Sequence, residues 1–194
     1  MKKLLITGFD AFGGETINPS WESVKRLPEK IGDFAITKLQ IPTAFKKGSQ
    51  KVLDVAKTIC PDVILCIGQA GGRQFVMPEV VAINLMDAKI ADNLGYKPIN
   101  EQILNGQNAY FSTIPVREIV ENLNAKGIPS ALSYSAGTFV CNEVLYTLLH
   151  HYENTSVRVG FIHVPFLPEQ AKNGEPSMSI EDIVNALKIA IETL

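Results

Sequence analysis

The feature that most constrains the fold is an alternation of short apolar segments with longer segments of helical periodicity. The apolar segments are rich in β-branched residues, and we predict strands over 3–9, 34–41, 62–68, 80–85, 130–134 and 157–164. Between them the spacing predicts helices over 19–27, 45–59, 115–126, 139–151 and 180–194. Almost wholly apolar strands that alternate with helices are typical of a largely parallel sheet covered on both faces. We therefore expect a three-layer α/β/α fold around a twisted, mixed sheet.

The chain shows no internal repeat, no low-complexity tract and no linker, so a single domain over residues 1–194 is predicted. With 46% hydrophobic residues it can bury one sizeable core. The segment 87–113 differs, because it is polar and carries little periodicity. We expect it to form a long excursion beside the functional site or at an interface.

Composition argues against several functional classes. The net charge of −2, with Lys and Arg scattered along the chain, offers no basic stripe for nucleic acid. The first apolar run, 4–6, is too short for a signal peptide, and no stretch approaches the ~20 residues of a membrane span. Three cysteines without metal-ligand spacing are expected to be free thiols, and a metal site is disfavoured. The protein is predicted to be soluble and cytoplasmic.

Four loops follow predicted strands, where open α/β sheets usually place their ligands. The first, 7–14, lacks both the dinucleotide and the P-loop spacing, and its Phe9 and Phe12 are explained equally well as core residues or as an apolar pocket. The second, 68–73, is rich in glycine, so its amides could approach a phosphate or an oxyanion, although a tight turn alone would explain it.

The other two loops offer a nucleophile and a base. Thr138 is a natural N-cap, which would place Cys141 in the first turn of a helix, where the helix end should lower the thiol pKa. His163 ends an apolar strand, and Glu79 also lies at a strand exit. In one parallel sheet the three could converge on one edge as nucleophile, base and orienting carboxylate. The alternatives are a buried structural thiol, a satisfied core histidine and a solvated surface charge.

Four blocks resemble the pyrrolidone carboxyl peptidases (pyroglutamyl peptidase I), a family of cysteine peptidases. They are TGFDAFGG with NPSWE, GQAGGR with PEVVAIN, SYSAGTFVCNEVLY and GFIHVPFLPEQ, in family order over residues 7–170. The resemblance implies removal of N-terminal pyroglutamate from peptides, with Cys141 as nucleophile, His163 as general base and acid, and Glu79 orienting the imidazole. It also implies an α/β/α fold, no metal or cofactor, and a homotetramer. It places the substrate pocket at Phe9, Phe12, Thr43, Gln69, Phe139 and Val140.

The chain departs from the family pattern near the carboxylate. The family usually has Arg or Lys after this glutamate and Ser or Thr two residues before it, where this chain has Val80 and Met77. The family's A-R-I-P-D-N is here A-K-I-A-D-N, so Lys89 replaces an arginine and a proline is lost. These departures motivate a second hypothesis, a protein that binds pyroglutamate without efficient turnover. A third, nucleotide or phosphate chemistry at the glycine-rich loops, rests on fold analogy alone.

Overall fold

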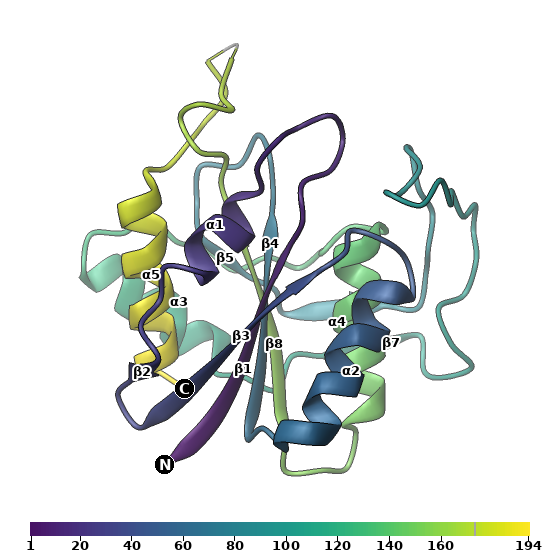
Figure 1. Cartoon of the computed structure of the whole chain (residues 1–194), viewed down its shortest axis with the longest axis horizontal. Helices are drawn as coiled ribbons and strands as arrows, with labels where there is room; N and C mark the ends of the chain where they lie inside the picture. The colour runs from purple at the N-terminus through teal and green to yellow at the C-terminus, as the bar shows by residue number, and fades with distance from the viewer. Residues whose placement is uncertain (173) are drawn as a thin grey trace.

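The computed structural model describes residues 1–172 and 174–194 and contains a six-stranded sheet in the order β2-β3-β1-β4-β8-β5 (Figure 1). The strands are β1 (Lys2–Phe9), β2 (Lys30–Ile31), β3 (Phe34–Ile41), β4 (Val63–Gln69), β5 (Met77–Pro78), β6 (Val81–Ile83), β7 (Ala109–Phe111) and β8 (Arg158–Val164). The helices are α1 (Pro19–Val24), α2 (Lys47–Ile59), α3 (Val116–Ala125), α4 (Val140–His151) and α5 (Ile180–Glu192). The four central strands run parallel, and the short edge strands β2 and β5 run antiparallel to their neighbours. The predicted α/β/α fold with a mixed sheet is confirmed.

Two of the predicted strands are wrong. The segment 80–85 contributes only β6, which pairs with β7 in a separate antiparallel ribbon against α4. The segment 130–134 forms only isolated bridges, at Ser130 and Ser133. Both segments are apolar because they pack beside the sheet, and an apolar run alone cannot distinguish such packing from pairing within it. The remaining four predicted strands are the central strands, found within one residue of their predicted bounds.

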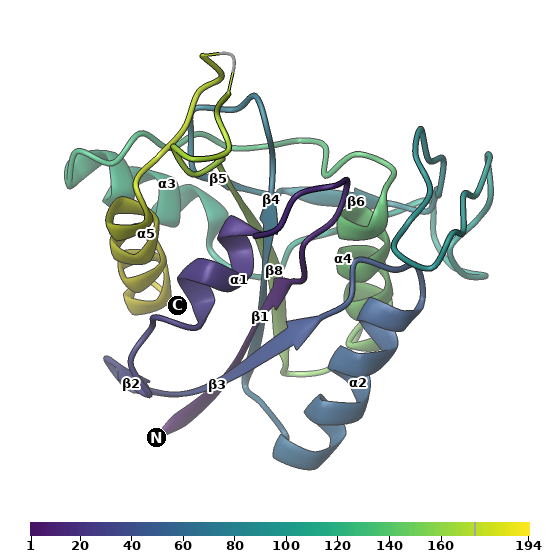
Figure 2. The ribbon, with the colours of Figure 1, turned by 45° about the horizontal axis from the view of Figure 1, so that its top comes forward.

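Helices cover both faces of the sheet, as Figures 1 and 2 show. On one face α1, α3 and α5 bury an aliphatic core that includes Leu65 and Ile67 of β4. On the other face α2 and α4 bury a second core that includes Cys66 of β4 and Phe161 of β8. The two cores alternate along each strand because successive side chains point to opposite faces. The even-numbered residues of β4, such as Ile64 and Cys66, thereby face α2 and α4.

Side chains cap the starts of two helices. Asn18 caps α1 by accepting a hydrogen bond from the Ser20 backbone, and the Ser179 hydroxyl accepts one from the backbone of Asp182 at the start of α5. Thr138 does not cap α4, because its hydroxyl donates to the Asp87 carbonyl at 2.7 Å and Phe139 takes the N-cap position. Thr138 does not act as the cap because its hydroxyl bonds instead to the segment 87–113.

The sheet opens at its carboxyl edge between β1 and β4. Pairing of β1 with β4 ends at Thr7 and Cys66, whereas pairing of β4 with β8 continues to Gln69. The Phe9 backbone N–H donates to the Ser20 hydroxyl at 2.9 Å and so does not pair with β4. The chain connects β1 to β3 on one side and then crosses to β4 on the other, so this gap is the topological switch point where ligands usually bind.

Candidate active site

A buried carboxylate and a buried imidazole form the centre of the site. His163 Nδ1 lies 2.6 Å from Glu79 Oε1, and the two residues are 5% and 0% exposed. This bond commits Nδ1 to the carboxylate, so Nε2 is the ring nitrogen left to exchange a proton with a nucleophile. The pair has the geometry of a general base oriented by an acid residue.

The position of Glu79 in the sheet differs from the prediction. It does not stand at the carboxyl end of a parallel strand, because it follows β5, which runs antiparallel to β8 with Met77 opposite His163. The Glu79 backbone N–H continues that pairing by donating to the Phe161 carbonyl at 2.9 Å. The expected convergence of the three residues on one edge is therefore achieved with an antiparallel edge strand.

Cys141 lies in the first turn of α4, as predicted, and its sulfur rests against the backbone of Gly68. A Cβ atom built on Gly68 would lie 3.1 Å from Cys141 Sγ and 2.6 Å from Cζ of Phe161. Gly68 is the register partner of His163, and paired residues of parallel strands point to the same face about 4.8 Å apart. Gly68 thus leaves space for the sulfur on the face of the sheet to which His163 also points.

The helix end does not make Cys141 a resting thiolate, which corrects the sequence expectation. Burial, followed by the negative charge of Glu79, raises the pKa of the Cys141 thiol to about 12. These causes outweigh the hydrogen bond from the residue's own backbone N–H, which lowers the pKa. A nucleophile at this position would therefore have to form by transfer of the thiol proton to a base.

Four aromatic rings lie in a row near the gap between β1 and β4. The rings of Phe12 and Phe139 lie 6.1 Å apart, and Phe45 meets Phe139 edge-on at 5.2 Å and Tyr96 at 5.8 Å. Phe45 was not singled out from the sequence, because it lies before α2 without any motif of its own. The row joins Phe12 and Phe139, two predicted pocket residues, to the excursion.

The other predicted pocket residues differ in what they can offer a ligand. The side chains of Phe9 and Val140 belong to the buried core on the α4 face. Thr43 is 3% exposed, and its backbone N–H and hydroxyl both donate to Asp10. Gln69 offers its backbone groups. Ala70 N–H donates to the Val164 carbonyl of β8, and alternate residues of a parallel strand bond to opposite neighbours. The N–H and C=O of Gln69 therefore face the gap beside β1.

The excursion is anchored to the site by its own polar side chains. Asn93 donates to Asp10 at 3.1 Å and to the Ala11 carbonyl at 2.9 Å, and Asp92 accepts the Phe45 N–H at 2.9 Å. The expectation that this segment lies beside the site is confirmed. The link could not be read from the sequence, since the bonded residues are more than 40 positions apart.

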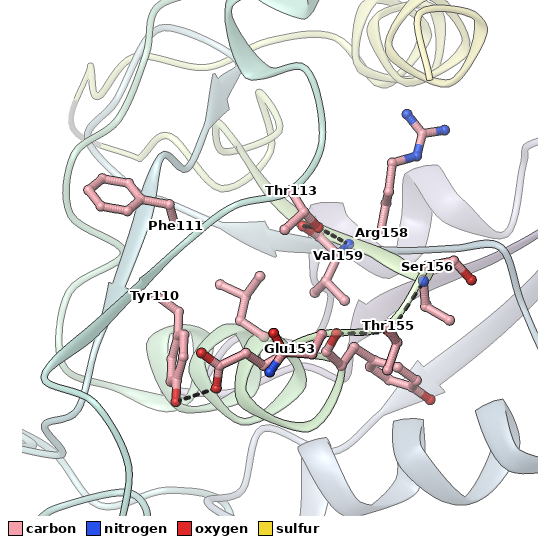
Figure 3. A pocket seen from close by; sticks show the side chains of 12 residues that line it. Tyr110, Phe111, Thr113, Glu153, Thr155, Ser156, Arg158 and Val159 are labelled. Carbon is pink, nitrogen blue, oxygen red and sulfur yellow. Dashed lines mark hydrogen bonds between the residues drawn. The ribbon is translucent and has the colours of Figure 1, made fainter.

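A separate pocket of about 200 Å³ lies at the opposite, amino end of β8 (Figure 3). It is lined by residues such as Tyr110, Glu153 and Arg158, and none of the predicted site residues lines it. Tyr110 donates to Glu153 at 3.1 Å, and Arg158 donates to the Leu194 carbonyl. Its polar groups are thus used within the fold, and the reactive groups lie elsewhere.

Comparison with known proteins agrees with this geometry. The family described as "Pyroglutamyl peptidase" matches residues 2–194. The chain belongs to this family. It is 49% identical to the pyrrolidone-carboxylate peptidase of Bacillus cereus (strain Q1), with 99% of this chain and 92% of that one covered.

Solved structures of relatives have the same fold as this chain. Pyroglutamyl peptidase I of Bacillus amyloliquefaciens superimposes with a TM-score of 0.95 at 48% identity, covering 100% of this chain and 96% of that one. Pyrrolidone carboxyl peptidase of Thermococcus litoralis does so with a TM-score of 0.95 at 37% identity, covering 100% and 93%. The predicted family and the predicted class, a cysteine-type hydrolase, are confirmed for the pyroglutamyl peptidase described here.

Within residues 1–172 and 174–194, no helix is both long and apolar enough to cross a bilayer. Within the same ranges, no group of three or more His, Cys, Asp and Glu side chains is arranged to hold a metal ion.

Proposed function

We propose that this pyroglutamyl peptidase removes N-terminal pyroglutamate from peptides with Cys141 as nucleophile, His163 as base and acid, and Glu79 as the orienting carboxylate. The observation that carries the proposal is the 2.6 Å bond between His163 and the buried Glu79, beside a thiol that needs a base. Family membership supplies the substrate class, and the relatives named for this activity support it.

The reaction follows from the protonation states. His163 Nε2 takes the Cys141 proton as the sulfur attacks the carbonyl carbon of the pyroglutamyl bond. The free backbone N–H groups at the start of α4 face the developing oxyanion. His163 then protonates the leaving amine, which gives a thioester, and water attacks that thioester with His163 again as base. Free pyroglutamate leaves and the thiol regains its proton.

In this proposal the lactam binds in the gap between β1 and β4. A lactam presents one N–H and one C=O side by side, which matches the C=O and N–H that Gln69 turns toward β1. Phe12 and Phe139 provide apolar surface for the ring carbons. An ordinary N-terminus carries an ammonium, whose transfer to such a slot without a partner costs on the order of several kcal/mol. The slot is therefore selective for pyroglutamate.

The test is release of a fluorophore from a pyroglutamyl amide, compared with the matching prolyl amide, which lacks the lactam carbonyl. We expect turnover of the first only, abolished in Cys141→Ser and retained in Cys60→Ser, which changes an exposed cysteine. Tight pyroglutamate binding without product would replace this proposal by a binding function. Full activity in Cys141→Ser would remove the nucleophile.

Assembly and location complete the proposal. We propose a homotetramer that acts in the cytoplasm. Support for association comes from the excursion, which exposes Ile90, Leu94 and Ile99 at 49%, 68% and 72%. Support for a reducing compartment comes from three free cysteines. Sedimentation equilibrium would measure the assembly, and a monomer at micromolar concentration would contradict it.

A further inference from the structure

Arg73 reaches back from the glycine turn after β4 to the catalytic carboxylate. Its Nη1 lies 3.6 Å from Glu79 Oε1 and donates to the Ser133 hydroxyl at 3.2 Å, while Nη2 donates to the Ser135 carbonyl at 3.4 Å. The Arg73 side chain is 36% exposed and Glu79 is fully buried. The guanidinium therefore contacts the carboxylate from the solvent side and is fixed by the loop that leads into α4.

Glu79 has few other groups to stabilise its charge. Oε1 is shared by His163 and Arg73, and Oε2 is buried without a hydrogen-bond partner among the described residues. Burying a carboxylate with so few donors is costly unless a positive charge lies nearby. Of the two ion pairs that Glu79 makes within residues 1–172 and 174–194, only the one with Arg73 has a permanent positive charge.

Met77, near the carboxylate in sequence, cannot supply a hydrogen-bond donor. It lies two residues before Glu79 and opposite His163 in the β5–β8 pairing. Its thioether cannot donate a hydrogen bond, and instead Met77 Sδ accepts from Arg73 Nη1 at 3.5 Å. No hydroxyl occupies this position, so the guanidinium is the group that compensates the buried charge.

We infer that Arg73 is a positioning residue for the hydrolysis: it holds Glu79 as a carboxylate with Oε1 directed at His163. It acts on the reaction only through Glu79 and touches neither the reacting atoms nor the lactam. The inference rests on the proposed function for its substrate measurement. Alkylation of Cys141 by iodoacetamide provides a second measurement that needs no substrate.

A double-mutant cycle separates this role from a structural one. We expect Arg73→Met to lower kcat by about tenfold, with little change in KM, because an outer partner of the catalytic group is lost. In a Glu79→Gln background the same substitution should change kcat by less than about twofold, because the charge through which Arg73 acts is already gone. Arg73→Lys keeps the charge and should retain more activity than Arg73→Met. Arg117→Met, on an exposed residue of α3, is the matched control.

Met77→Thr tests whether a new hydrogen-bond donor can restore kcat. A hydroxyl at this position can donate to the unpartnered Oε2 of Glu79, so in the Arg73→Met background it should restore part of the lost kcat, about threefold or more. The same threonine should have little effect in the Glu79→Gln background. Thermal unfolding of each variant records whether the fold is intact.

Three results would overturn the inference. They are an unchanged kcat in Arg73→Met, a loss that appears wholly in KM, and a loss of equal size in the Glu79→Gln background. If the wild-type protein cleaves no pyroglutamyl amide, the proposed function fails, and the cycle is then read from the alkylation rate. Arg73→Met should slow alkylation of Cys141 when Glu79 is present and leave it unchanged in Glu79→Gln; equal slowing in both would reject the inference.

Discussion

At the scale of single residues, Glu79 has two effects on Cys141 that act in opposite senses. Glu79 raises the pKa of the Cys141 thiol through its negative charge, and in the proposed mechanism it also orients the imidazole that removes the thiol proton. In that mechanism the resting thiol is poorly reactive until His163 accepts its proton. This arrangement limits side reactions of an enzyme with a partly exposed cysteine.

Glu79→Gln separates these two effects. The thiol pKa of Cys141 should fall, because one of the causes that raise it is removed, although burial keeps it above the ordinary value. Turnover should nevertheless fall by roughly 100-fold or more, because the amide cannot stabilise the imidazolium. Ultraviolet absorbance of the thiolate against pH and the kcat for a pyroglutamyl amide measure the two quantities. A thiol pKa that rises in this variant would contradict the assignment.

A second buried carboxyl, Glu143, gives a prediction about stability. Burial raises the pKa of Glu143, although Ser49 and Thr147 donate to its Oε1 at 2.7 and 3.0 Å. Because the folded protein then binds this proton more tightly than the unfolded chain, the group stabilises the fold at low pH and this contribution is lost as the pH rises above 4.5.

Glu143→Gln removes that titration and keeps an oxygen for the two hydroxyl donors. We expect the variant to have a higher melting temperature than wild type at pH 7, with an advantage that shrinks as the pH falls toward 4.5. Calorimetry across this range measures the difference. Glu118→Gln, on the exposed surface of α3, is the control and should show little change. An advantage that grows toward low pH would show that the assigned direction is wrong.

At the scale of elements, α4, which carries the proposed nucleophile, is held in place at its first turn by side-chain hydrogen bonds. Asn142, next to Cys141 and 1% exposed, accepts the Ile83 N–H and donates to the carbonyls of Ile83 and Leu85 at 2.8–3.0 Å. These bonds replace the pairing that β6 would have had in the main sheet. The prediction of a sheet strand over 80–85 is wrong because the Asn142 side chain, and not a neighbouring strand of the main sheet, bonds to the backbone of Ile83 and Leu85.

Asn142→Ala should loosen this junction. Three hydrogen bonds to partly buried backbone groups are lost, at a cost of about 0.5–1.5 kcal/mol for each bond. We expect a lower free energy of unfolding together with a lower kcat, since Cys141 is the adjacent residue. Urea denaturation and the fluorogenic assay measure both. The control is Asn122→Ala, which removes one exposed bond to Thr193; an equal loss in both variants would contradict the role of Asn142.

At the scale of the whole molecule, packing divides three chemically identical thiols into three environments. Cys60 is exposed at the end of α2, Cys141 is partly buried at the site, and Cys66 is fully buried in β4. Burial raises the pKa of the Cys66 thiol to about 12, so it lacks both access and reactivity.

A thiol reagent should therefore modify Cys60 quickly and Cys141 slowly, and it should reach Cys66 only after unfolding. Loss of activity should follow the slow phase, and Cys60→Ser should remove the fast phase without loss of activity. A reductant should leave the melting temperature unchanged, since the cysteines are free. Time-resolved thiol titration with parallel activity assays measures these phases; inactivation that follows the fast phase would contradict the prediction.

The sequence by itself determined the central sheet, because β-branched apolar runs and helical spacing report local burial directly. It also predicted the pair of Cys141 and His163, because the start of a helix and the end of an apolar strand can be read from local pattern. The family resemblance extended this pair to Glu79 and the pocket residues, and family membership is now established by comparison over residues 2–194.

Only the tertiary structure decided what depends on long-range contacts. It placed Glu79 through an antiparallel edge strand, put Arg73 against its carboxylate, and joined Asp92 and Asn93 to the pocket loops. It also reversed the expected direction of the Cys141 pKa shift, because the burial of a sulfur and its distance from a charge are not properties of sequence position. Local spacing fixes which elements form, whereas charge and solvent exclusion at the site arise from residues far apart in the chain.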